Sequence, residues 1–160
     1  MKTNIVRWIP LLALSACATS PEVVAADNGQ PKMQAAMQAL QHAKAELEAA
    51  SPNKGGHREQ AIGLTQQAID ATNAGMRYAA EHPTEIGEAE GPAMPEPVNE
   101  NVPGAERQPH MARAMIDLRE AHRQLAEAKH DKGGHRVQAL RFIHDAMVQI
   151  RDGINFANSH

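Results

Sequence analysis

The chain is poor in aromatic residues and in cysteine, and both shortages limit what it can be. Aromatic residues make up 2% of its 160 residues, and Cys17 is the only cysteine. A single cysteine excludes an intramolecular disulfide and a Cys-x-x-Cys-His haem attachment. Ala, Gln, Leu and Met are plentiful instead, and together they favour helix over strand. The composition therefore predicts an all-α protein with an aliphatic core.

Catalytic motifs are missing as well. The sequence has no Gly-x-Ser-x-Gly elbow, no phosphate-binding loop and no His-Glu-x-x-His helix, so we expect no enzymatic activity. The formal net charge is −3, and a surface of that sign does not steer the protein toward nucleic acid. No apolar run reaches the roughly 18 residues of a membrane-spanning helix.

The start of the chain has the pattern of an export signal. Lys2 and Arg7 accompany a short apolar stretch, residues 8–16, as in secretory signal peptides. Residues 14–17, Leu-Ser-Ala-Cys, then resemble the lipobox of bacterial lipoproteins. The resemblance implies that residues 1–16 are removed and that Cys17 becomes a lipid-bearing N-terminus. Because Ala18 rather than Asp follows, it also implies an outer-membrane lipoprotein facing the periplasm.

Ordinary signal cleavage is the alternative for this region. Val24-Ala25-Ala26 suits cleavage before Asp27. Cleavage there would discard Cys17 and leave a soluble periplasmic or secreted protein. The two alternatives differ in whether the mature protein carries lipid.

An internal repeat organises the rest of the chain. At an offset of 78 positions, residues 33–79 align with 111–157 without a gap, and 17 of the 47 pairs are identical. The matched apolar positions recur at steps of three and four, which is typical of one buried face per helix. We therefore predict two tandem αα-hairpins, residues 32–82 and 110–160, packed as a four-helix bundle. The alternative is that each hairpin pairs with a copy on another chain, which would give a homo-oligomer.

The segments outside the hairpins are expected to carry no stable helix. Residues 17–31 would be a tether that follows the signal. Residues 83–109 hold six prolines and six glutamates, and that density of proline breaks helices. We expect this second segment to be a solvated linker.

Both hairpins bend at the same five residues, Lys-Gly-Gly-His-Arg. A glycine there can take the left-handed conformation that ends a helix. Backbone N–H groups, the start of the next helix and the basic side chains could together bind a small anion. The alternative is structural, with His capping or packing the bend and Arg pairing with an acid. The residues concerned are Lys54, His57, Arg58, Lys132, His135 and Arg136. The hairpin also looks like segments of uncharacterised exported bacterial proteins, a likeness that implies no activity.

Methionine and histidine side chains raise a second hypothesis, a metal site. Thioether and imidazole groups can hold copper in an oxidising compartment, and equivalent positions of the two repeats could meet at one end of the bundle. The alternative is that each methionine fills space in the core. The candidate ligands are Met33, Met37, His110, Met111 and Met115.

These observations favour a lipid-anchored helical binding or structural module that faces the periplasm and has no cofactor. Its partners would be the membrane, through the lipid, and an envelope protein or a small anion. The alternative is a periplasmic protein that binds copper or zinc through His and Met.

Overall fold

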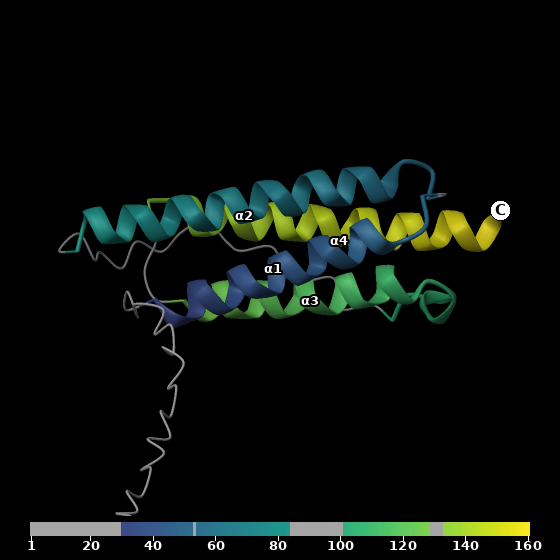
Figure 1. Ribbon diagram of the computed structural model, residues 1–160, viewed down its shortest axis with the longest axis horizontal. Helices are drawn as coiled ribbons and strands as arrows, with labels where there is room; N and C mark the ends of the chain where they lie inside the picture. The colour runs from purple at the N-terminus through teal and green to yellow at the C-terminus, as the bar shows by residue number, and fades with distance from the viewer. Residues whose placement is uncertain (1–29, 53, 84–100, 129–132) are drawn as a thin grey trace, which may run out of the picture.

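The computed structural model describes residues 30–52, 54–83, 101–128 and 133–160, which form an antiparallel bundle of four helices (Figure 1). Helices α1 (Pro31–Ala49) and α2 (His57–Glu81) form the first hairpin. The 3-10 helix η1 (Ala105–Arg107) precedes the second hairpin, α3 (Pro109–Glu127) and α4 (His135–Ser159). No strand occurs in these ranges, so the predicted all-α hairpin fold is confirmed. The signal peptide, Cys17 and Lys132 lie outside the described residues.

The two repeats begin and turn in the same way. A proline stands in the first turn of both α1 and α3, where a missing N–H costs no hydrogen bond. Helix α1 therefore starts at Pro31, inside the segment expected to be a tether. The second helix of each hairpin follows a glycine in the left-handed region, Gly56 with φ 82° and Gly134 with φ 79°. An L side chain adopts that conformation at a cost, which explains the glycine.

Two contacts show how the hairpins are placed against each other. Lys32 at the start of α1 pairs with Glu127 at the end of α3. At the opposite end, His110 Nδ1 at the start of α3 lies 2.7 Å from Glu46 Oε2 near the end of α1. Helices α1 and α3 are therefore antiparallel. The most extensive helix contacts join α1 to α3 and α2 to α4, so each helix packs mainly on its counterpart in the other repeat.

This arrangement puts the two bends at opposite ends of the bundle, as Figure 1 shows. The bend between α1 and α2 lies beside the end of α4, because Gly55 packs against Phe156. The bend between α3 and α4 lies beside the end of α2, because Gly133 packs against Tyr78. The molecule thus approximates two-fold symmetry, and each end combines the bend of one repeat with the termini of the other.

The core is aliphatic, as the composition predicted. Its largest fully buried side chains are leucine, isoleucine and methionine, at the positions of the apolar stripe. Alanines on the stripe, among them Ala36, Ala43, Ala114 and Ala121, are fully buried. Gly153 extends this close packing, since a Cβ built on it would lie 3.0 Å from Met111 Cε and 3.2 Å from His57 Cβ. Small residues therefore set how closely the helices approach.

The last part of the linker is not a solvated segment, contrary to the expectation from its proline content. Val102 is only 7% exposed and belongs to the core. The side-chain amide of Asn158 donates a hydrogen bond of 2.9 Å to the carbonyl oxygen of Pro103. Burial of one valine and this hydrogen bond therefore tie residues 102 and 103 to the bundle.

Candidate functional site

The arginine of each bend closes the end of the preceding helix. Arg58 donates from Nε to the carbonyl oxygen of Leu47 at 2.8 Å and from Nη2 to that of Glu48 at 2.9 Å. Arg136 donates from Nη1 to the carbonyl oxygens of Leu125 and Ala126, both at 3.3 Å. The last carbonyls of a helix lack partners within the helix, and a cation there also complements the helix dipole. The two guanidinium groups therefore bind helix carbonyls.

The other polar groups of the first bend also contact the protein itself. Lys54 is 3% exposed, and its Nζ donates to Ser51 Oγ at 2.9 Å. Burial, with a smaller contribution from the charge of Arg58, lowers the pKa of the Lys54 ammonium group. His57 Nδ1 is hydrogen-bonded to Gln149 Oε1 of α4 at 2.8 Å. In the second bend, the His135 ring lies edge-on to Tyr78, with centroids 6.4 Å apart.

These contacts favour the structural interpretation of the bends over the anion site. The structural hypothesis expected each arginine to pair with an acid. The main acceptors are instead carbonyl oxygens of the preceding helix, although Arg58 also pairs with Glu59 at 2.8 Å. The two bends cannot form one paired site, because they lie at opposite ends of the bundle (Figure 1).

Each bend also packs on an aromatic ring of the other repeat. A Cβ on Gly55 (φ 60°) would lie 2.9 Å from the Phe156 ring, and one on Gly133 (φ 63°) would lie 2.9 Å from the Tyr78 ring. Tyr78 and Phe156 occupy equivalent positions. The position of the first glycine in each bend therefore requires this residue for two reasons: its backbone is left-handed, and the aromatic ring leaves no space for a side chain.

The equivalence continues past the range aligned from the sequence. His82 stacks on Tyr78 and His160 stacks on Phe156, with centroid distances of 4.1 and 4.2 Å. These histidines are also 78 positions apart. Extending the repeat by three residues pairs these histidines, although residues 80 and 81 differ from residues 158 and 159.

The candidate metal ligands are not brought together. Met33 and Met111 are 1% and 0% exposed, and they lie at the starts of the antiparallel helices α1 and α3, hence at opposite ends. The expectation that equivalent positions meet at one end is therefore wrong. His110 is bound to Glu46. Within the described part of the chain, no group of three His, Cys, Asp or Glu side chains is placed to hold a metal ion.

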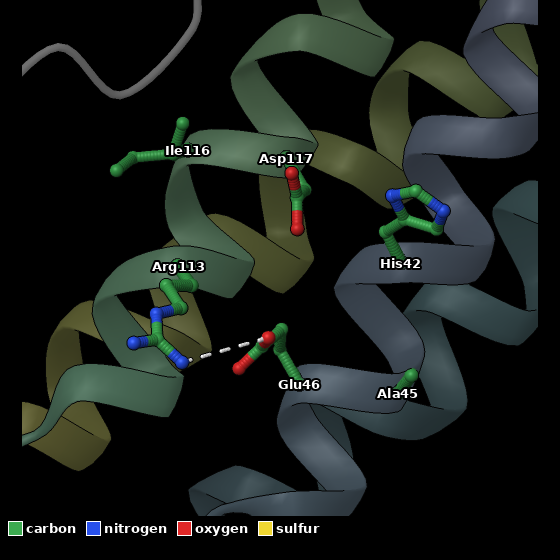
Figure 2. Close-up of a pocket in the computed structure, with 6 residues that line it drawn as sticks. All are labelled: His42, Ala45, Glu46, Arg113, Ile116 and Asp117. Carbon is green, nitrogen blue, oxygen red and sulfur yellow. Dashed lines mark ion pairs between the residues drawn. The ribbon is translucent and has the colours of Figure 1, made fainter.

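A groove between α1 and α3, which sequence analysis did not find, does gather side chains from both repeats (Figure 2). Its volume is about 420 Å³. Figure 2 shows Glu46 and Asp117 on opposite walls, with the dashed line marking the 3.9 Å ion pair between Glu46 and Arg113. The lining residues are His42, Ala45, Glu46, Arg113, Ile116 and Asp117.

Two side chains in this groove are in unfavourable surroundings. Ile116 is 61% exposed, and it is the one large apolar side chain so exposed within the described ranges. Burial raises the pKa of the Asp117 carboxyl group; the charge of His42 lowers this pKa and that of Glu46 raises it further. A carboxylate beside another carboxylate gains when a cation approaches, and an exposed isoleucine gains when an apolar group covers it.

The two-fold-related position lacks these residues. At the offset of 78, Gln38 stands for Ile116, Ala39 for Asp117 and Gln124 for Glu46. Ion pairs occur at both positions: Arg123 contacts Glu120 and Glu127 at 2.6 and 3.0 Å, and in the groove Glu46 contacts His110 and Arg113. The repeats have therefore diverged in this groove while their bends stayed identical.

Comparison with protein-family models, curated proteins and solved structures gave no match. None of the described helices is both long enough and apolar enough to cross a membrane.

Proposed function

We propose that the protein is a non-catalytic binding module of the cell envelope, anchored by lipid on Cys17, and that the α1–α3 groove binds a peptide segment of an envelope protein. The lipobox at residues 14–17 supports the anchor. The observation that carries the binding site is that an exposed isoleucine and two facing carboxyl groups meet in this groove, whereas the equivalent positions 38, 39 and 124 carry Gln, Ala and Gln.

The side chains that line the groove determine which kind of peptide it would bind. Asp117 and Glu46 face each other across it. Burial is the main cause of the raised pKa of Asp117, the charge of His42 opposes it, and repulsion by Glu46 adds a smaller increase. A lysine or arginine side chain between the two carboxylates would relieve that repulsion. Ile116 adjoins the same space and would pack on an apolar side chain. The occupant is therefore a peptide segment in which basic and apolar residues adjoin.

This preference can be measured with two defined peptides. One consists of alternating leucine and lysine, and the other has glutamate in place of lysine. In NMR titrations, the leucine–lysine peptide should shift the δ1-methyl signal of Ile116, whereas the glutamate peptide should not. Equal shifts with both peptides, or none with either, would overturn the proposed site.

The repeat supplies a matched control for the same titration. The double substitution Ile116→Gln and Asp117→Ala gives α3 the residues that α1 carries at positions 38 and 39. Both positions are on the bundle surface or partly exposed, so the fold should remain. The variant should lose binding of the leucine–lysine peptide.

A further inference from the structure

The two carboxyl groups of the α1–α3 groove differ in what holds them. Glu46 has a partner from α3 on each oxygen, since His110 Nδ1 lies 2.7 Å from Oε2 and Arg113 Nη1 lies 3.9 Å from Oε1. Asp117 differs, because no side chain of the described residues forms an ion pair with its carboxylate. Asp117 is therefore the carboxyl group of the groove that is left to receive a cation from outside.

His42 of α1 faces Asp117. Figure 2 shows these two side chains on opposite walls at one level of the groove, with Glu46 and Arg113 at the next level. All described residues that line the groove come from α1 and α3, so these are the charged groups that surround His42. Its charge acts on Asp117, whose pKa it lowers against the larger effect of burial. Because histidine gains its charge between about pH 8 and pH 5, this counter-charge is present in mild acid and fades as the pH rises.

The two-fold-related position carries permanent charges where the groove carries histidines. At the offset of 78, Glu120 stands for His42 and Lys32 stands for His110. Neither glutamate nor lysine ordinarily changes its charge near neutral pH, and both of these side chains form ion pairs. A charge that changes near neutral pH therefore belongs to the groove and not to its counterpart.

The net charge of the groove changes sign over this range of pH. With neutral histidines, the carboxylates of Glu46 and Asp117 and the guanidinium group of Arg113 sum to −1. With His42 and His110 protonated, the sum becomes +1. A basic ligand is attracted by the first arrangement and repelled by the second.

We propose that Asp117 binds the cation of a basic ligand and that protonated His42 competes with this cation, so that the groove holds the ligand at neutral pH and releases it in mild acid. The inference rests on the proposed peptide-binding function of the groove. Glu46, held by its partners on α3, adds negative potential beside the ligand. Because coupling between two sites is reciprocal, the bound ligand favours the neutral form of His42 in turn.

The test repeats the peptide titration with the processed protein, purified in detergent from its host, at about pH 7.5 and about pH 5.5. The leucine–lysine peptide is acetylated at its N-terminus, and its lysines keep their charge at both values, so a change in affinity belongs to the protein. The dissociation constant, measured from the Ile116 methyl signal, should rise about threefold or more in acid. Bound peptide should also move the midpoint of the His42 imidazole titration to lower pH.

Three variants identify the responsible side chain. His42→Gln removes the titratable charge and should bind the peptide nearly equally at both pH values. His42→Lys keeps a positive charge and should bind weakly at both. His110→Gln is the matched control and should retain the loss of affinity in acid, because Arg113 still pairs with Glu46. His42 is exposed and His110 is partly exposed, so the fold should tolerate these changes.

The outcomes separate this inference from the proposed function. Absence of peptide binding at either pH would overturn the proposed function, and the role of His42 with it. Equal binding at both pH values, or a loss in acid that persists in His42→Gln, would overturn the role of His42 alone. If His110→Gln were the variant that became independent of pH, Glu46 and not Asp117 would be the group that receives the cation.

Discussion

The bends and the α1–α3 groove evolved differently from the same duplication. The five bend residues are identical in both copies, and in the structure the bend arginines bind carbonyl oxygens of the preceding helix while the first glycines contact the other repeat. The groove combines an exposed isoleucine with facing carboxyl groups, and the equivalent positions 38, 39 and 124 of the other copy carry Gln, Ala and Gln. Identity between the repeats therefore reports shared backbone geometry, whereas divergence between them is where a binding function can arise.

The largest effect is expected from the first glycine of a bend. In Gly55→Ala, the new side chain would stand on a left-handed backbone, and its Cβ would lie 2.9 Å from the Phe156 ring. The substitution should therefore lower the free energy of unfolding by about 2–4 kcal/mol. Gly56→Ala meets only the backbone penalty, because no atom lies within 4 Å of its Cβ, and it should cost about 1–2 kcal/mol. Denaturant titration measures both. Equal losses would show that the ring contact contributes nothing.

The bend arginines come next in size. Arg58→Ala removes the donors to the carbonyl oxygens of Leu47 and Glu48 and should cost about 1–3 kcal/mol. Arg58→Lys keeps the charge without the planar fork and should recover only part of the loss. If Arg58→Ala melts like the wild type and loses binding of inorganic phosphate instead, the first bend is an anion site and not a purely structural element.

Close helix approach is tested by a pair of glycine substitutions. Gly153→Ala should destabilise the protein by about 1 kcal/mol, because the new Cβ would press on Met111 and His57. Gly63→Ala faces open space and should stabilise the helix by about 0.5–1 kcal/mol. Thermal unfolding gives both values. A stabilising Gly153→Ala would mean that Met111 and His57 do not require a residue without a side chain at this position of α4.

The smallest effect concerns Asp117. Its raised pKa means that the folded protein favours the protonated carboxyl group, so stability falls as pH rises from the ordinary pKa of Asp through the higher folded value. Asp117→Asn should therefore be slightly more stable than the wild type at neutral pH and equal to it in acid. Unfolding at a series of pH values measures this difference. If Asp117→Asn were stabilised more in acid than at neutral pH, the pKa of Asp117 would be lowered, not raised, in the folded protein.

Much of the fold was predictable from local signals. The steps of three and four among residues such as Met33, Met37 and Leu40 indicated the helices, and Lys-Gly-Gly-His-Arg indicated a left-handed turn. The packing of one hairpin on the other was not predictable, because it depends on contacts between distant residues. Gly55 and Phe156, or Glu46 and His110, meet only after the second hairpin is oriented, and a 27-residue linker permits either orientation.

The candidate site escaped prediction for a related reason. A search for shared residues directs attention to the bends, whereas Glu46 and Asp117 lie on different helices and have no acidic counterparts in the other repeat. The burial of Val102 was not predicted either, because the proline content of residues 83–109 indicated a solvated linker. Its burial depends on the core that the packed helices form, not on its neighbours in the sequence.

The most direct test of the central claim sets two double variants against each other, with binding of the leucine–lysine peptide and melting temperature measured on both. Arg58→Ala with Arg136→Ala should lower the melting temperature and, at temperatures where the protein stays folded, bind the peptide as the wild type does. Ile116→Gln with Asp117→Ala should keep the melting temperature within about 3 °C of wild type and lose the peptide. The opposite pattern, with binding lost only in the arginine variant, would contradict the division between structural bends and a binding groove.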